Sequence, residues 1–365
     1  MGQTLTEIAQ KLKDSDKKVQ LIYAFNGVGK TRLSVEFKHL ISPDLEDSYD
    51  EGNNLNFLYY NAFTEDLFHW DNDLENNIER KIKIQPNSFT NWLLRDEGKE
   101  NDVVNNFVAY TNTKLTPYFD KDFSEVSFST KDENGDVIKN VKISKGEESC
   151  FVWSVFYSIL ELVISELSED KDNRSSYIFD NLSHIFIDDP VTSLDENHLI
   201  RLAIDLAQQI KRAPTCLNFV ITTHNPLFYN VLYNELKNSQ KYILSKHTDG
   251  TYNLENQPND SPFSYHLFLL SEIKEAIDSN SLQKYHFNMF RNILEKTSTF
   301  LGFNEWGDLL RDEFDKKQIT RLINISSHSK VSSMEISDLT EEDRVVLKNL
   351  MQTMMNTYHF NIQQY

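Results

Sequence analysis

The segment from Val19 to Ile41 constrains the fold more than any other part of the chain. It begins with an apolar stretch of strand composition, VQLIYAF, continues through a turn with two glycines, and ends in the helical-looking TRLSVEFKHLI. The turn fits the pattern G-x-x-x-x-G-K-[ST], except that Ala24 replaces the first glycine. A strand, a glycine-containing loop and a helix in this order predict a phosphate-binding loop.

Each position of this loop has a predicted role. Backbone N–H groups at Asn26, Gly27 and Gly29 would surround phosphate oxygens. Lys30 would bring positive charge to the β and γ phosphates, and the Thr31 hydroxyl would bind Mg²⁺. The alternative is a chance glycine-lysine turn, which the flanking strand and helix make the weaker interpretation.

A second apolar strand, SHIFIDDP, ends in two carboxylates. Asp188 would hold the metal through water, and Asp189 would orient or deprotonate the attacking water. An exposed acidic turn has the same local sequence. The phosphate loop elsewhere in the chain favours the catalytic interpretation.

Three further motifs resemble those of the ABC ATPases. The tripeptide SLD at 193–195 is similar to their D-loop, and His224, after the strand LNFVITT, is similar to their switch histidine. The segment SKGE at 144–147 is similar to the signature that opens a helix, with Lys145 in place of a glycine. In that family the signature caps nucleotide held by the other subunit, so the resemblance implies a head-to-tail dimer or a higher homo-oligomer. It assigns four more residues to nucleotide binding: Ser144, Gly146, Glu147 and Asp195.

Length and composition predict two domains. A chain of 365 residues exceeds what one hydrophobic core usually supports, and the break NQPNDSP at 256–262 precedes a helical-looking remainder. Helices between apolar strands imply a mostly parallel α/β sheet, and the tetrapeptide at 133–136 predicts a hairpin turn. We therefore expect an ABC-type P-loop ATPase domain over 1–262 and a mainly helical effector domain over 263–365.

Several classes of protein are excluded at this stage. No stretch approaches the length needed to cross a bilayer, which predicts a cytoplasmic chain without a membrane partner. The region between Thr31 and Ser144 has no sustained apolar heptads, so a long coiled-coil arm is not expected. Cys150 and Cys216 lie in apolar contexts and are predicted to fill the core.

The net charge of −19 argues against a protein coated in nucleic acid. Residues 316–334, however, contain no acid, and their four basic residues are the predicted contact for RNA. These are Lys316, Lys317, Arg321 and Lys330.

Arg291 and Glu295 are four residues apart, so a helix would place both on one face. Alone, they would be an ordinary salt bridge. With His328 they form the set that a metal-independent ribonuclease needs. A carboxylate takes the proton of the 2′-OH, a histidine protonates the 5′ leaving oxygen, and an arginine stabilises charge on phosphorus. This route leaves a 2′,3′-cyclic phosphate.

Arg-x-x-x-Glu followed some thirty residues later by His also resembles the catalytic pattern of the PrrC-type anticodon nucleases. The segments TLTEIAQKL, AFNGVGKTRLS and ISKGEE are similar to that family as well. The resemblance implies antiphage defence by cleavage of lysine tRNA, silenced by a type I restriction–modification complex. It also implies ATP or GTP hydrolysis with Mg²⁺ and regulation by a thymidine nucleotide.

An alternative of a different class stays open. An ABC-type ATPase of a DNA-repair or phage-sensing system could gate a separate nuclease and carry Arg, Glu and His in its C-terminal helices for structural reasons. A purely structural dimeric clamp is a third and weaker hypothesis.

Overall fold

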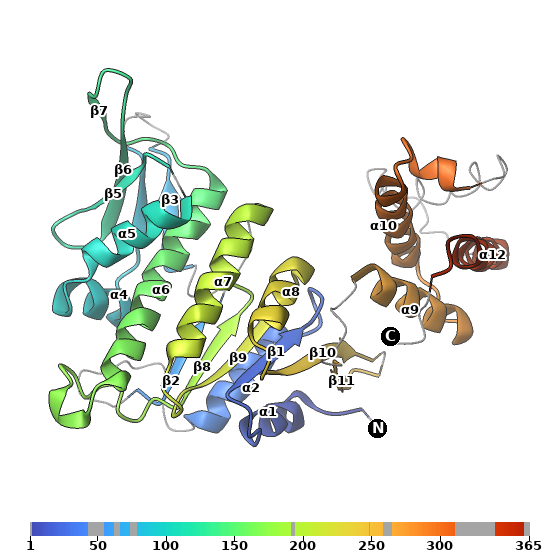
Figure 1. The fold of residues 1–365 in the computed structure, drawn as a ribbon, viewed down its shortest axis with the longest axis horizontal. Helices are drawn as coiled ribbons and strands as arrows, with labels where there is room; N and C mark the ends of the chain where they lie inside the picture. Colours follow the sequence, from blue (N-terminus) through green and yellow to red (C-terminus); the bar gives the residue numbers. More distant parts are fainter. Residues whose placement is uncertain are drawn as a thin grey trace. The chain divides into compact units, whose positions relative to one another are not determined.

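The computed structural model describes residues 2–42, 55–61, 66–73, 79–111, 113–190, 194–247, 249–257, 265–310 and 340–360. The chain divides into two compact units, Met1–Phe263 and Ser264–Tyr365. Figure 1 shows a mixed α/β first unit and a helical second unit.

The main sheet of the first unit has six strands, in the order β11-β10-β1-β9-β8-β2. The pairings from β10 through β2 are parallel, and only β11 runs antiparallel to its neighbour. The mostly parallel sheet predicted from the sequence is therefore confirmed. The strands are β1 (Val19–Tyr23), β2 (Phe57–Tyr60), β8 (His184–Asp188), β9 (Asn218–Thr223), β10 (Gln240–Lys246) and β11 (Tyr252–Asn256).

Helices cover both faces of this sheet, as its almost continuous apolar strands require. On one face, α1 (Leu5–Lys13) and α2 (Lys30–Ile41) join a buried cluster that contains Ile22 and Phe186. On the other face, Tyr23 makes an edge contact with Tyr229 of α8 (Pro226–Glu235), with 5.7 Å between ring centroids. Figure 1 shows α7 (Glu196–Arg212) beside α8.

A smaller antiparallel sheet, in the order β3-β4-β6-β5, lies in the same unit. Phe128 of β6 packs on Phe107 of α5 (Glu100–Thr111) and on Phe151, which gives this sheet one buried face. β7 pairs with β6 through a turn in which Gly135 N–H donates to the carbonyl of Asp132, so the predicted hairpin is confirmed. The strands are β3 (Phe68–Asp71), β4 (Lys81–Ile84), β5 (Thr116–Phe119), β6 (Glu125–Lys131) and β7 (Val137–Ile138). Short helical segments flank them: α4 (Ser88–Asn91), the π-helix η1 (Trp92–Asp96) and the 3₁₀ helix η2 (Lys171–Asn173).

The helix α6 (Lys145–Ser168) is the core helix between the two sheets. By length and apolar composition it could cross a membrane, so the expectation that no stretch approaches that length is wrong. Its apolar character is explained by packing, because 83% of its most apolar window is buried inside the fold. Cys150 on this helix is buried as predicted, whereas Cys216 is exposed, which corrects the prediction for that residue.

The second unit is helical throughout its described residues, as the sequence predicts. Its elements are α9 (Tyr265–Asp278), α10 (Lys284–Leu301), the 3₁₀ helix η3 (Trp306–Leu309) and α12 (Glu341–Tyr358). Ile273, Phe290 and Leu347, one from each of the three long helices, are at most 1% exposed. α10 ends at Gly302, whose φ of 78° suits a left-handed cap.

Candidate functional site

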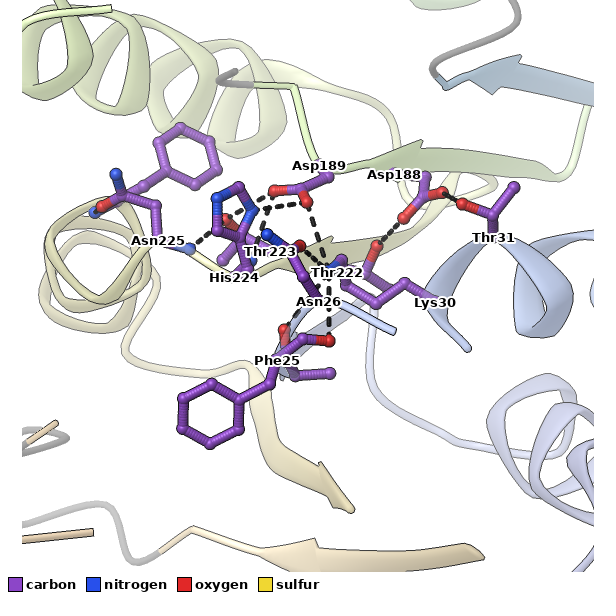
Figure 2. A network of polar contacts seen from close by, with 12 residues as sticks. Phe25, Asn26, Lys30, Thr31, Asp188, Asp189, Thr222, Thr223, His224 and Asn225 are labelled. Atoms are coloured by element: carbon purple, nitrogen blue, oxygen red, sulfur yellow. Dashed lines mark hydrogen bonds and ion pairs between the residues drawn. The ribbon is translucent and has the colours of Figure 1, made fainter. Parts of the chain in front are cut away.

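The carboxyl ends of three neighbouring strands bring the predicted phosphate and hydrolysis residues together. β1 leads into the phosphate loop, β9 leads into His224, and β8 ends in Asp188 and Asp189. Because these strands are parallel neighbours, residues almost two hundred positions apart meet at one edge. Figure 2 shows the resulting polar network.

The phosphate loop depends on two glycines in the left-handed region. Gly27 has a φ of 81°, and Gly29, which precedes the first turn of α2, has a φ of 119°. A Cβ built on Gly27 would meet nothing within 4 Å, so backbone conformation and not crowding demands glycine there. The loop therefore enters α2 with no side chain at the cap, which leaves backbone N–H groups available for an anion.

The ammonium group of Lys30 is enclosed by oxygen atoms, and its side chain is only 7% exposed. Its Nζ lies 3.0 Å from Asn26 Oδ1 and 3.3 Å from Asp189 Oδ2. The carbonyl oxygens of Ala24 and Phe25 lie at 3.3 and 3.4 Å. The predicted phosphate-binding cation thus points into the loop and links it to the acidic pair (Figure 2).

Asp188 is 2% exposed and is held by two hydroxyls. Thr31 Oγ1 donates to Asp188 Oδ2 at 2.7 Å, and Thr222 Oγ1 donates to Asp188 Oδ1. Burial is the largest influence on the pKa of Asp188 and raises it above the ordinary value, against the two hydrogen bonds. Thr31 and Asp188 offer the hard oxygen ligands that Mg²⁺ prefers, so the residues present fit the metal that the phosphate loop implies.

Asp189 adopts a left-handed backbone conformation, with a φ of 52°, directly after the strand. Its Oδ2 accepts a 2.5 Å hydrogen bond from His224 Nδ1, and its Oδ1 lies 3.2 Å from the His224 N–H and 3.3 Å from Thr223 Oγ1. Burial alone would raise the pKa of Asp189, but the His224 hydrogen bonds and the Lys30 charge hold it below its ordinary value. The arrangement keeps this carboxylate ionised, as a base that orients water requires.

Two polar features of the site were not predicted. Thr222 and Thr223 are the last residues of β9, and their hydroxyls donate to Asp188 and Asp189, respectively. The sequence feature that could have predicted them is the pair of threonines directly before His224. Tyr59 of β2 shares a short hydrogen bond with Ser34 Oγ, which itself donates to the carbonyl of Thr31 at 2.7 Å. A tyrosine on a distant strand therefore helps to fix the first turn of α2, and no local pattern marks it.

The signature-like segment has a clear local role. Ser144 caps α6 by accepting from Glu147 N–H at 3.2 Å, and Glu147 Oε2 accepts from Ser144 N–H at 2.7 Å. This is a capping box. Lys145 pairs with Glu148 at 2.7 Å, and Gly146 lies in the first turn.

The D-loop-like segment also contributes a cap. Asp195 begins α7 by accepting from the N–H groups of Asn197 and His198 at 3.0 and 3.1 Å, and its pKa is lowered chiefly by the His198 backbone hydrogen bond. Ser193 lies outside the described residues. Both motifs thus cap helices, and their predicted nucleotide contacts stay predictions.

The C-terminal constellation is described only in part. On α10, Arg291 Nε donates to Glu295 Oε1 at 2.7 Å, and the two side chains are 40% and 45% exposed. The spacing thus places both on one accessible helix face. His328 and the predicted RNA contacts Lys316, Lys317, Arg321 and Lys330 lie outside the described residues.

Comparison with known proteins gives one extensive match. The anticodon nuclease of Escherichia coli is 46% identical over 389 aligned positions, which cover 99% of this chain and 98% of that protein. A family model described as an AAA domain matches residues 94–354.

Solved structures give more distant likenesses. The SMC head bound to the C-winged helix domain of ScpA is 11% identical, with a TM-score of 0.36. The SMC head domain from Thermotoga maritima is 12% identical, with a TM-score of 0.32. Each match covers 67% of this chain and 91% of the other.

Proposed function

Since this chain belongs to the family of the Escherichia coli anticodon nuclease, we propose that it is a tRNA endoribonuclease gated by nucleotide hydrolysis in its first unit. One observation carries the proposal: an accessible Arg–Glu pair on α10 belongs to the same chain as a phosphate loop, two aspartates and a histidine joined in one network. An ATPase domain alone needs no such pair.

In the proposed cleavage, the Glu295 carboxylate takes the proton of the ribose 2′-OH next to the scissile bond. The 2′ oxygen attacks phosphorus while the bond to the 5′ oxygen breaks, and His328 gives that oxygen a proton. Arg291 stabilises the negative charge on the phosphoryl oxygens. The products are a 2′,3′-cyclic phosphate and a 5′ hydroxyl, and the step needs no metal ion.

In the proposed hydrolysis, the loop N–H groups and Lys30 hold the phosphates, and Asp189, oriented by His224, positions water against the γ-phosphate. Thr31 and Asp188 hold Mg²⁺, which supplies positive charge to the phosphate oxygens when bound. The lowered pKa of Asp189 supports its assignment as the ionised group.

The finer assignments follow the family resemblance. We propose ATP or GTP as the hydrolysed nucleotide, a thymidine nucleotide as regulator and lysine tRNA as substrate. A head-to-tail homodimer or higher homo-oligomer through the first unit would complete each nucleotide site with Ser144, Gly146, Glu147 and Asp195 of the second copy. Control by a type I restriction–modification complex, in antiphage defence in the cytoplasm, belongs to the same proposal.

The test is to incubate the purified chain with total tRNA and Mg²⁺-ATP or Mg²⁺-GTP and to map the ends of the fragments. We expect discrete cuts with 2′,3′-cyclic phosphate ends, lost in Arg291→Ala, Glu295→Ala and His328→Ala. Lys296→Ala, an exposed position on the same helix, is the matched control. Intact tRNA with the wild-type chain under every nucleotide would refute the nuclease function.

One observation favours the alternative, an ATPase that gates a separate nuclease. Arg291 and Glu295 have the spacing and exposure of an ordinary helix salt bridge. Expression of the chain alone separates the two functions, because it should arrest growth only if the chain itself cuts tRNA. Relief of that arrest by His328→Ala, with nucleotide hydrolysis unchanged, would exclude the alternative.

A further inference from the structure

The outer surface of the small sheet carries a shallow hollow of about 220 Å³ between β5, β6 and the start of β7. Its lining comprises Thr130, Val137 and five further residues: Lys114, Thr116, Tyr118, Ser129 and Lys131. We refer to these five residues as the β5–β6 hollow. None of them belongs to the nucleotide site or to the Arg291–Glu295 pair.

The register of the sheet explains why these side chains gather. Thr116 pairs with Ser129 and Tyr118 pairs with Ser127, whereas Phe128, between them, is buried against α5 and α6. Because side chains alternate between the two faces of a strand, Thr116, Tyr118, Ser129 and Lys131 share the outer face. Ser129, 5% exposed, forms the floor, and Tyr118, 54% exposed, stands at the rim.

The hollow is basic in an acidic chain. Lys114 and Lys131 form no ion pair with the part of the chain that the structure describes, and no acid lines the hollow. Two nearby acids accept hydrogen bonds in turns: Asp120 accepts from the N–H groups of Ser124 and Glu125, and Asp132 from those of Asn134 and Asp136. Two unpaired ammonium groups therefore flank an exposed aromatic ring and two hydroxyls.

We propose that the β5–β6 hollow binds one nucleotide of a single-stranded segment of the RNA substrate. Lys114 and Lys131 contact the phosphates on either side of that nucleotide, Tyr118 stacks on its base, and Thr116 and Ser129 offer hydroxyls to the ribose. Single-stranded RNA is held in this way, by bases stacked on aromatic side chains beside basic groups. The inference rests on the proposed function and deepens it by giving the ATPase unit an RNA contact of its own.

The size of the hollow favours a single-stranded RNA segment over a free nucleotide as its ligand. Pockets that hold whole small molecules usually enclose about 300–1,000 Å³, and the 220 Å³ of this one is open to solvent. A strand needs less enclosure, because its neighbouring nucleotides bind elsewhere on the protein. The contact would strengthen substrate binding and take no part in the bond-breaking step.

Binding is measured in the full chain carrying Glu295→Ala, so that cleavage does not interfere. The probe is a fluorescein-labelled single-stranded RNA of about twelve nucleotides, titrated by anisotropy at several salt concentrations, with total tRNA and AMP as competitors. We expect Tyr118→Leu to weaken binding roughly tenfold, the usual scale for one stacked base. The double variant Lys114→Gln, Lys131→Gln should reduce the slope of log K against log salt concentration by about 1.4, because each phosphate contact contributes about 0.7 to that slope.

The matched control is Lys139→Gln with Lys142→Gln, two exposed lysines after β7 that do not line the hollow. If the control and test variants lose the same affinity for RNA, the effect is one of overall charge and the proposal is wrong. Unchanged RNA affinity in the test variants would also overturn it. If AMP competes as strongly as tRNA, the hollow binds a free nucleotide and the proposal of a single-stranded RNA segment is wrong.

The proposed RNA contact and the proposed nuclease function can be refuted separately. If the wild-type chain cuts tRNA while Tyr118→Leu binds RNA normally, the hollow is not an RNA contact and the nuclease function stands. If Tyr118→Leu loses RNA binding while the wild-type chain cuts nothing, the contact stands and the nuclease function fails.

Discussion

Ser144 allows the helix cap and the predicted phosphate contact to be tested separately. In the structure its hydroxyl caps α6, and in the proposed dimer it also faces the γ-phosphate bound by the second copy. Ser144→Ala removes both roles. Ser144→Asp keeps the cap, because aspartate caps helices about as well as serine and its charge suits a helix N-terminus, but it would repel a phosphate.

The magnitude follows from the capping box. Ser144→Ala removes the 3.2 Å bond from Glu147 N–H and leaves the reciprocal 2.7 Å bond to the Glu147 carboxylate. The loss of a cap of this kind costs about 1 kcal/mol of unfolding free energy. If the unfolding free energy falls by roughly 3 kcal/mol per molar urea, the urea concentration at the unfolding midpoint of the first unit would decrease by about 0.3 M. Ser144→Asp should leave that midpoint within error of the wild type.

Two measurements are needed. Circular dichroism monitors unfolding in urea and gives the stability, and light scattering after gel filtration with a non-hydrolysable nucleotide and Mg²⁺ gives the oligomeric state. We expect Ser144→Asp to be as stable as the wild type and yet to stay monomeric with nucleotide, whereas Ser144→Ala is less stable and dimerises weakly. Nucleotide-dependent dimers of Ser144→Asp at wild-type strength would refute the placement of Ser144 against a phosphate. Its role would then be the helix cap alone.

Three further outcomes are expected. His224→Ala removes the imidazole hydrogen bond, the largest of the influences that lower the pKa of Asp189, and keeps the bond from the backbone N–H. The acid limb of the pH profile for nucleotide hydrolysis should therefore move to higher pH, and an unmoved limb would contradict the proposed role of Asp189 as the ionised base. Burial raises the pKa of Tyr59 to about 12, so Tyr59→Phe removes a neutral hydroxyl that hydrogen-bonds to Ser34 and Asn61 and should lower the unfolding free energy by about 1 to 2 kcal/mol in urea titrations. Arg291→Lys should lower tRNA cleavage at least tenfold while the melting temperature changes little, because the ion pair is 40–45% exposed and lysine cannot reproduce the guanidinium fork.

Local patterns were sufficient where one segment determined its own structure. The strand, loop and helix around Lys30 and the buried strand before Asp188 are present as predicted, because each carries its own periodicity and turn residues. The turn at Gly135 was equally local. The signature-like segment at 144–147 was predicted to open a helix, and α6 begins there, but the expectation that no stretch could cross a bilayer missed the length and apolar composition of this helix.

The contacts that define the site were not local. Asp189 meets His224 and Lys30 because β8, β9 and β1 are parallel neighbours in register, a fact of strand order that no single segment contains. The same holds for Tyr59 and Ser34, from a strand and a helix 25 positions apart. The β5–β6 hollow depends on which strands of the small sheet are neighbours, and those strands are too short for their periodicity to show it.

The geometry around Asp189 suggests how nucleotide binding and hydrolysis are linked. Its Oδ2 lies 2.5 Å from His224 Nδ1 and 3.3 Å from Lys30 Nζ, so two cation-capable groups share one oxygen. A bound phosphate would compete for the Lys30 ammonium, which is one of the influences that lower the pKa of Asp189. If Lys30 turns to phosphate, Asp189 loses one of the influences that lower its pKa, while the hydrogen bonds from His224 remain. His224 would then be the main group that keeps Asp189 ionised and oriented for its proposed role in positioning the attacking water.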